Sequence, residues 1–433
     1  MKQPVTLAIV GAGMRGQAYA NFALEHPDLA KVVAVAEPRD FQRERMVQAH
    51  GIPAENVFVT WEDLAAKPRL ADAAIICTQD RMHLAPMLAA APKGYAILME
   101  KPMATSLAEC ERIVACARAY GNIFAVCHVL LYTDFTIRLK ALLDSGLIGE
   151  VVNVQHLEPV GWWHQAHSFV RGNWANEGES TFMLLAKCCH DIDWLRHIMG
   201  RPCRSVASFG SLRHFRASER PAGAADRCLD CSVEAACPYS AKRFYLDQFD
   251  RDWINRYCVA VITDDHTPEG VKKALREGPY GRCVYACDND VVDNQIVALD
   301  FADGATASLT MTAFAPQSDR KTRLFGTRGY IETDSAQIRH FDFVSEKSAT
   351  IDTRVFDDAS KAVVSHGGGD HGIMKAFVEA VASGDQRRVW SGPAETLASH
   401  RIVFAAEKAR RENRVVEMRE LAHNGSEVCP TKP

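Results

Sequence analysis

The sequence contains no apolar run near the 18 residues that a membrane-spanning helix needs, and no internal repeat or low-complexity linker. Its N-terminus enters a strand-like run directly, without the apolar core and cleavage site of a signal peptide. The net charge is only −4, which indicates neither a nucleic-acid surface nor a membrane surface. We therefore expect a cytoplasmic protein whose partners are small molecules.

Cysteine is too scarce for a disulfide scaffold, at 14 in 433 residues. A reducing cytosol keeps most such residues as thiols. Cys77, Cys110 and Cys127 lie within apolar patterns, so we expect them in the core. With 47% hydrophobic and 24% charged residues, the composition is that of an ordinary globular protein with room for two or three domains.

A dinucleotide-binding pattern opens the chain. The apolar run Thr6–Val10 is followed by Gly-x-Gly-x-x-Gly and then by a helical pattern, and a second apolar run ends at Glu37. Glycines at this spacing let the backbone approach a pyrophosphate at a helix N-terminus, and the acidic residue accepts hydrogen bonds from the ribose. The predicted contacts within the glycine motif are Gly11, Gly13, Met14, Arg15 and Gly16.

The choice between NAD and NADP is less clear from the same segment. Glu37 repels a 2′-phosphate and so favours NAD. Arg39 and Arg43 follow closely and are suited to NADP. NAD is favoured, with NADP kept as the alternative.

A lysine stands where the strand Ala96–Met99 ends, in the turn Glu100-Lys101-Pro102. Strands and helices alternate up to residue 126, which predicts a doubly wound parallel sheet, an α/β Rossmann domain over residues 1–126. Open sheets of this kind hold ligands at the carboxyl ends of their strands, so Glu100, Lys101 and the turn from Thr78 to His83 should contact the cofactor. The alternative is a surface lysine paired with Glu100.

In residues 127–433 the sequence pattern is no longer one of alternating strands and helices. Extended segments follow one another, and Asp303-Gly304 separates two of them as a hairpin turn does. Strands paired by hairpins predict a mostly antiparallel sheet in an α+β domain. The expected strands are Val151–His156, Ser205–Phe209, Gln295–Phe301, Ala305–Ala313 and Lys321–Phe325. We expect the free face of this sheet to build a homo-oligomer, a dimer or a tetramer.

The glycine motif, Glu37 and Glu100-Lys101-Pro102 together resemble the Gfo/Idh/MocA oxidoreductase family across nearly the whole chain. The resemblance implies a Rossmann domain joined to an antiparallel αβ domain, and NAD(P)-dependent oxidation or reduction of sugar hydroxyls. It also implies that Lys101 is the active-site lysine beside the nicotinamide.

A helix is predicted over Leu184–Leu195, and in the family it carries an aspartate followed four residues later by a histidine. His190 matches the histidine, but Ala186 stands in place of the aspartate. Lys187 and Asp191 are the candidates to replace it in part, as a catalytic and a substrate-binding residue. His190, with an ordinary pKa of about 6.5, suits a general base, and a desolvated Lys101 is the alternative base.

Aromatic and polar side chains alternate between Gly161 and Trp174, a composition that suits a sugar because indole rings stack on C–H faces while polar groups take hydroxyls. The alternative is a loop whose aromatic rings fold onto the core. The predicted substrate contacts here are His164, His167, Arg171, Asn173 and Trp174.

A cysteine-rich insert is expected at about residues 215–290. Its thiols have the spacing C-x2-C-x5-C, and two more follow about 46 residues later. We predict a structural zinc, because four thiolates suit tetrahedral zinc. An iron–sulfur cluster and plain reduced cysteines are the alternatives. The predicted ligands are Cys228, Cys231, Cys237 and Cys283, with Cys287 in reserve. The insert also resembles a subgroup of the family, which implies a glycoside or an uncommon sugar as substrate rather than inositol.

Three functions remain open at this stage. The first is an NAD(P)-dependent dehydrogenase of a sugar or sugar derivative. The second is a glycosidase with a retained NAD, working by oxidation, elimination, hydration and reduction. The third is a dinucleotide-sensing protein without catalysis, against which the presence of Lys101 and His190 argues.

Overall fold

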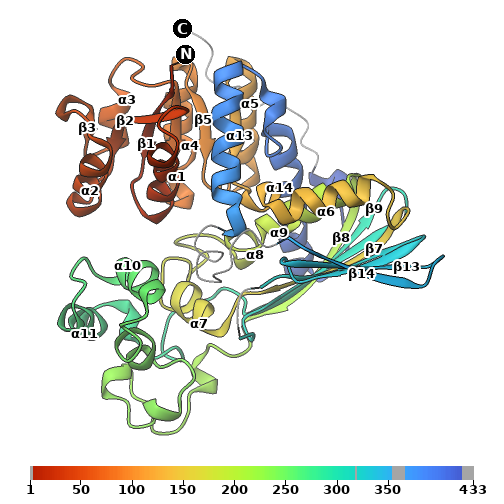
Figure 1. Cartoon of the computed structure of the whole chain (residues 1–433). Coiled ribbons are helices and arrows are strands. Elements are labelled where there is room, and N and C mark those ends of the chain that lie inside the picture. Colours follow the sequence, from red (N-terminus) through yellow and green to blue (C-terminus); the bar gives the residue numbers. More distant parts are fainter. Residues whose placement is uncertain (1–2, 317–318, 354–365, 422–433) are drawn as a thin grey trace.

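The computed structural model describes residues 3–316, 319–353 and 366–421. A parallel sheet wrapped by helices lies at one end, a larger sheet lies beside it, and an insert of short helices stands apart below (Figure 1). Within the described residues, no helix is both long enough and apolar enough to cross a bilayer.

Six parallel strands form the first sheet, in the order β3-β2-β1-β4-β5-β6. They are β1 Val5–Val10, β2 Ala30–Ala36, β3 Val57–Phe58, β4 Ala73–Ile76, β5 Ala96–Met99 and β6 Phe124–Val126. The alternating helices are α1 Met14–Glu25, α2 Asp40–His50, α3 Trp61–Ala65, α4 Leu84–Ala90 and α5 Leu107–Tyr120. The predicted doubly wound sheet is confirmed, and the strand order reverses between β1 and β4, where such sheets bind ligands.

Local sequence explains how the helix after the lysine turn is bounded. Ser106 accepts a hydrogen bond of 3.3 Å from the backbone N–H of Glu109, which caps the start of α5. Gly121 ends it with a φ of 66°, a left-handed conformation that glycine adopts without steric cost. These two signals fix α5 against β5 and so fix the turn between them.

Nine strands form the second sheet, in the order β14-β13-β12-β11-β7-β10-β9-β8-β15. They are β7 Val151–Pro159, β8 Cys203–Ser211, β9 Asn294–Phe301, β10 Thr306–Thr312, β11 Lys321–Gly326, β12 Gly329–Thr333, β13 Gln337–Asp342, β14 Lys347–Asp352 and β15 Val416–Glu417. The predicted hairpin joins β9 to β10 with Gly304 at a φ of 90°. The mostly antiparallel sheet is confirmed, with one exception: β7 and β10 run parallel.

Two expectations need correction. The helix predicted over Leu184–Leu195 is broken into α8 Met183–Ala186 and α9 Cys189–Met199. Cys188 leaves the helical region with ψ at 7°, so Lys187 and His190 do not share one regular helix face. The strands β12 to β14 went unpredicted, because these short segments carry charged side chains on their exposed faces and lack a long apolar alternation.

Along the chain, α6 Asp134–Asp144 precedes β7 and α7 Trp162–His164 follows it, while α10 Ala260–Ile262 and α11 Pro268–Glu277 lie between β8 and β9. The chain then returns to the first sheet through α13 Gly369–Ser383 and α14 Pro393–Glu412 (Figure 1). One hydrophobic cluster includes Leu7 of β1, Leu309 of β10 and Val403 of α14, so the two sheets share a core.

The returning segment also covers the open edge of the first sheet. The side chain of Gln386 accepts a hydrogen bond from Phe124 N at 2.8 Å and donates one to Phe124 O at 2.9 Å. These bonds occupy the backbone groups that a further strand would otherwise pair with on β6.

Candidate active site

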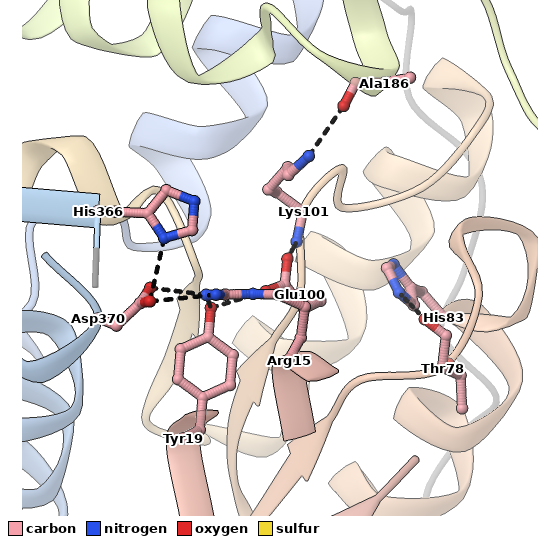
Figure 2. Close-up of polar contacts among 9 residues, drawn as sticks. All are labelled: Arg15, Tyr19, Thr78, His83, Glu100, Lys101, Ala186, His366 and Asp370. Atoms are coloured by element: carbon pink, nitrogen blue, oxygen red, sulfur yellow. Dashed lines mark hydrogen bonds and ion pairs between the residues drawn. The ribbon is translucent and has the colours of Figure 1, made fainter. Parts of the chain in front are cut away.

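Lys101 lies at the carboxyl end of β5 and reaches across to the second domain. Its Nζ donates a hydrogen bond of 2.8 Å to the carbonyl oxygen of Ala186, the last residue of α8 (Figure 2). Its backbone N–H donates to Glu100 Oε2 at 2.7 Å. The lysine is therefore held at the junction of the two sheets and is no free surface charge.

Glu100 is fixed by a buried ion network. Arg15 Nε lies 2.6 Å from Glu100 Oε1, and the Tyr19 hydroxyl donates to the same oxygen at 2.7 Å. Arg15 also pairs with Asp370 of α13 at 2.6 Å, and His366 lies against that carboxylate (Figure 2). Burial acts to raise the pKa of Glu100, but Arg15 and Lys101 outweigh it and the pKa is lowered. The carboxylate thus stays charged beneath Lys101.

His190, in α9, lies near enough to this lysine for the lysine charge to act on it. The residue is 7% exposed, and its buried Nδ1 has no hydrogen-bond partner among the described residues. Burial, followed by the charge of Lys101 and the ring of His128, lowers the pKa of His190 well below its ordinary value. His190 is therefore neutral near pH 7, with a ring nitrogen free to take a proton.

A second charged network backs the site from β7. Arg320 Nε lies 2.6 Å from Asp191 Oδ1 and 3.0 Å from Glu158 Oε2, and both carboxylates are fully buried. His156 Nε2 lies 2.9 Å from the same Asp191 oxygen, and Lys187 Nζ lies 3.3 Å from Glu158 Oε1. Burial acts to raise the pKa of Asp191, but Arg320 and His156 bring it well below the ordinary value.

Two of the predicted site residues, Asp191 and Lys187, belong to this network. Asp191 was predicted to bind substrate, yet its oxygens are occupied by Arg320 and His156, so its contacts make it a support for α9. Lys187 keeps only a loose pairing with Glu158 and is half-buried at the break between α8 and α9.

The predicted substrate segment folds into a helical turn with irregular hydrogen bonding over Gln165–Val170. His164 is half-buried, and burial, Lys187, His167 and Lys101 all lower its pKa well below the ordinary value. His167 is buried, with Nδ1 2.5 Å from the Tyr245 hydroxyl, and burial and Arg171 lower its pKa to about 3. His164 thus lies near enough to Lys187 and Lys101 for both charges to act on it.

The remaining predicted substrate residues lie elsewhere. Trp174 Nε1 donates to Asp80 Oδ2 at 2.9 Å and so joins the second domain to the turn after β4. Asn173 is exposed. Arg171 is 6% exposed and turns away from Lys101, toward the cysteine insert, where it donates to Cys228 Sγ and Tyr239 O.

The glycine motif has the form that a pyrophosphate needs. Gly11 has a φ of 90°, and a Cβ there would lie 2.6 Å from Cys77 O. A Cβ on Gly16 would lie 2.0 Å from Gly11 O, so only glycine lets α1 pack this close to β1. Gly13 and the exposed Met14 leave the start of α1 open, which fits the phosphates of a dinucleotide.

Glu37 and the turn after β4 complete the predicted cofactor contacts. Glu37 Oε2 accepts from Ala12 N at 2.7 Å and Arg39 Nε pairs with Oε1 at 2.8 Å, which places the carboxylate beside the glycine loop. The buried ring of His83 lies 2.8 Å from Pro102 O and 3.1 Å from Thr78 O, and so fastens the turn after β4 to the lysine turn. Arg15 does not face this loop, because Glu100 and Asp370 hold it.

Replacing Glu37 by serine should weaken NAD binding at least about tenfold, because a charged hydrogen bond to the ribose contributes roughly 1.5–3 kcal/mol. NADP should bind better, since Arg39 loses its partner and can meet a 2′-phosphate. Titration of both nucleotides measures this. Glu44→Ser, on the exposed face of α2, is the control and should change neither affinity. An unchanged preference in the Glu37 variant would contradict the ribose contact.

The predicted tetrahedral zinc site is not supported by the cysteine geometry. Among the described residues, the one group of three His, Cys, Asp or Glu ligand atoms within 4.8 Å of one another is Glu25, His26 and His371. No three sulfurs of the insert approach that closely, whereas zinc at about 2.3 Å from each sulfur needs them closer together.

Residues 5–128 match the family model described as "Oxidoreductase family, NAD-binding Rossmann fold", and residues 140–418 match "Oxidoreductase family, C-terminal alpha/beta domain". The chain belongs to the Gfo/Idh/MocA oxidoreductase family. The resemblance seen in the sequence is confirmed, and NAD binding is assigned to the first domain. The special subgroup suggested by the cysteine insert stays a prediction.

Several curated Gfo/Idh/MocA relatives match only in part. YteT of Bacillus subtilis (strain 168) is 24% identical over 269 residues, 61% of this chain and 60% of the relative. The 2,7-anhydro-N-acetylneuraminate hydratase of Escherichia coli (strain K12) is 25% identical over 207 residues, 48% of this chain and 52% of its own. The inositol 2-dehydrogenase of Ralstonia nicotianae is 31% identical over 144 residues, 33% of this chain and 42% of its own. The chain thus spans about half the length of such relatives.

Solved structures match over nearly the whole length. Levoglucosan dehydrogenase in complex with NADH and levoglucosan superposes with a TM-score of 0.70 at 17% identity, covering 96% of this chain and 100% of the other. An oxidoreductase from Agrobacterium radiobacter, in complex with NAD+, L-tartaric acid and magnesium, gives 0.70 at 15% identity, covering 97% and 100%. At these identities the similarity establishes the Gfo/Idh/MocA fold alone.

Several contributors to the site were not predicted: Tyr19, His156, Glu158, Arg320 and Asp370. Arg320 precedes a predicted strand, and Glu158 lies in the extension of another, where no local pattern marks a buried charge. One signal was available. Buried charges must be paired, so an acidic residue in the apolar run of β7 required a cation from elsewhere in the chain.

Proposed function

We propose that this protein oxidises a hydroxyl-bearing carbon of a sugar or sugar derivative with NAD, and that His190 is the base and Lys101 the electrostatic partner. The observation that carries the proposal is that Lys101 bonds to the segment just before His190 and acts on the pKa of that histidine. Lys101 is anchored on Ala186 O, four residues before His190, and its charge lowers the pKa of that histidine. The position of Lys101 directly after β5 also supports the proposal, because such sheets bind their cofactor at the carboxyl ends of the strands.

The residues divide the reaction between them. A neutral His190 accepts the hydroxyl proton on a ring nitrogen as the carbon is oxidised. The ammonium of Lys101 stabilises the negative charge that develops on the oxygen. Glu100, charged and buried, keeps the lysine turn in place through the backbone N–H of Lys101. Bound NAD supplies the acceptor for the hydride.

A sugar-like substrate is supported by the side chains around the lysine. His164 and Lys187 are polar, half-buried side chains, and the charges of Lys187 and Lys101 both act on His164. Among the similar proteins, one is named an inositol dehydrogenase, one a levoglucosan dehydrogenase and one a hydratase of an anhydro sugar acid.

A second candidate is a redox-neutral reaction on a glycoside. Oxidising a ring hydroxyl makes a neighbouring C–H acidic, so that a second base can remove that proton and expel the aglycone. Water then adds, and the ketone is reduced again. The observation in favour is His164, whose lowered pKa keeps it neutral beside both Lys101 and Lys187. A relative named as a hydratase catalyses no net oxidation, which fits such a cycle.

The deciding experiment incubates the protein and NAD with a panel of free sugars and aryl glycosides, and follows NADH absorbance and released aglycone together. NADH formed with a free sugar supports the dehydrogenase and names its substrate class. Aglycone released without net NADH supports the redox-neutral cycle. A panel that yields neither product contradicts the proposed substrate class.

The pH profile tests the base. Because the pKa of His190 lies well below 6.5, the neutral form persists as the pH falls through 6.5, and kcat/KM should stay constant there and decline only at lower pH. Lys101→Met should raise the pKa of His190, which NMR of the imidazole can follow without turnover. An acid limb centred at or above pH 6.5 in the unaltered protein would contradict this assignment.

We also propose that the protein self-associates through the second sheet. Phe209 of β8 and Ile296 of β9 are directly paired and are 65% and 53% exposed. Adjacent apolar side chains at this exposure suit a covered face. Light scattering should find a dimer or tetramer that Phe209→Arg dissociates. A monomeric unaltered protein would refute the proposal.

A further inference from the structure

The cysteine insert encloses a hollow that the hydride-transfer reaction does not use. Its volume is about 180 Å³, and its wall includes all four cysteines with the predicted ligand spacing: Cys228, Cys231, Cys237 and Cys283. Cys258 and Cys287, the other two cysteines of the insert, are not part of the wall, and the thiol of Cys287 donates instead to Cys283 O at 3.3 Å. The structure therefore separates the four predicted ligands from the other two cysteines.

Local backbone structure brings these cysteines together. Tight turns over Cys228–Asp230 and Glu234–Ala236 place Cys231 and Cys237 directly after them, at the rim of the hollow. Cys283 arrives from more than forty residues downstream, held by a hydrogen bond of 2.8 Å from its N–H to Asp226 O. Cys228 and Cys283 are 7% and 8% exposed, so the hollow lies beneath the surface.

The spacing of the sulfurs excludes a single tetrahedral ion in this arrangement. A zinc ion with sulfurs at about 2.3 Å holds them roughly 3.8 Å from one another. No three of the insert's sulfurs lie within 4.8 Å of one another. An iron–sulfur cluster spreads its four thiolates wider, because they bind different irons. The room inside the wall suits a group of several atoms.

The buried charge of Arg171 also favours a metal centre bound by thiolates. Arg171 is 6% exposed and also belongs to the wall, with Nη2 3.5 Å from Cys228 Sγ. Its other donors reach Arg282 O at 2.7 Å and Tyr239 O at 2.8 Å, and no carboxylate in the described ranges forms an ion pair with it. A buried cation without an anion is costly, and thiolates around a metal centre supply the missing negative charge.

Glu234 is the other charged residue of the wall, and its negative charge is offset by neighbouring side chains. Glu234 accepts a hydrogen bond from the Ser240 hydroxyl, and Lys242 Nζ lies 3.7 Å from its carboxylate. The net charge offered to an occupant is therefore that of Arg171 and the four thiols, which lose their protons on binding metal.

We propose that the insert binds an iron–sulfur cluster through Cys228, Cys231, Cys237 and Cys283, with Arg171 balancing its charge. The cluster fixes the substrate side of the active site. Arg171 follows the turn that carries His164 and His167, and His167 is bonded to Tyr245 of the insert. The cluster has a structural role and transfers no electrons in the proposed sugar oxidation, which needs no electron carrier beyond NAD.

The test measures metal in the full-length protein purified without oxygen, and again after incubation with ferrous iron, sulfide and thiol. We expect two to about four irons per chain with matching acid-labile sulfide, and thiolate-to-iron absorption that dithionite bleaches. The iron count distinguishes a two-iron from a four-iron cluster. One zinc per chain with no iron uptake, or no metal at all after incubation, would overturn the proposal.

Variants assign the ligands. Cys231→Ser should lose most of the bound iron, while Cys287→Ser, its matched neighbour outside the wall, should keep it. Retention of iron by the first variant and its loss in the second would refute this ligand set. Should Cys231→Ser fail to fold, the metal content of the unaltered protein and of Cys287→Ser still decides between cluster, zinc and an empty site.

Discussion

Lys101→Ala should lower kcat at least a hundredfold, because the variant loses the charge placed to stabilise the developing alkoxide. NAD affinity should stay close to normal, since the glycine loop and Glu37 lie on other strands of the first sheet. The Lys101 ammonium is anchored by Ala186 O, so its position and its charge are lost together. Steady-state kinetics with the substrate found in the panel, and nucleotide titration, measure the two effects separately.

A matched control exists on the far side of the same domain. Lys93 also donates its ammonium hydrogens to backbone carbonyls, those of Ala65 and Lys67, yet it lies away from the lysine turn. Lys93→Ala should therefore keep the rate of the unaltered protein. A Lys101→Ala variant that retained most of its rate would remove Lys101 from the catalytic machinery.

Arg320→Ala should destabilise the fold by about 3–5 kcal/mol, the usual cost of leaving buried charges without their partner. Asp191 and Glu158 are both fully buried, and Arg320 pairs with each of them. Without the guanidinium, His156 and Lys187 remain as single weaker partners. Denaturant unfolding followed by circular dichroism measures the loss.

Arg323→Ala is the matched control on β11. Arg323 and Glu332 form an ion pair of 3.4 Å, with side chains 55% and 41% exposed, and such pairs contribute at most about 1 kcal/mol. Equal losses for the two variants would mean that burial of the Arg320 network does not increase its contribution to stability.

The same network should make the stability of the fold depend on pH. The pKa of Asp191 lies below its unfolded value, so the stability it contributes is present at neutral pH and is lost as the pH falls through that lowered pKa.

The first domain could be predicted because its signals are local. The glycine motif, Glu37 and the Glu100-Lys101-Pro102 turn each depend on neighbours within a few residues, and they implied both the sheet and the place of the lysine. The capping pair Ser106 and Glu109 is of the same kind. Where the chain itself sets the geometry, sequence patterns were sufficient.

The supports of the site depend on distant partners and escaped prediction. Arg15 matched a cofactor motif, yet it pairs with Asp370, which lies 355 residues away. Arg320 and Asp191 are 129 residues apart. The break at Cys188 likewise interrupts a continuous apolar periodicity that gave no sign of it. The four cysteines grouped by their spacing line one hollow, but their separation in space depends on how the insert packs.

The position of Gln386 in the chain leaves the edge of β6 unpaired for part of synthesis. The backbone groups of Phe124 are synthesised 262 residues before the Gln386 side chain that pairs with them. At roughly 5–20 residues per second, a ribosome needs roughly 13 to 50 s to synthesise those residues. Throughout that interval β6 presents bare hydrogen-bonding groups to any other nascent chain nearby. Polypeptides terminated before this glutamine should therefore associate through β6 and depend on chaperones. In the complete chain, the Gln386 side chain occupies these backbone groups of β6.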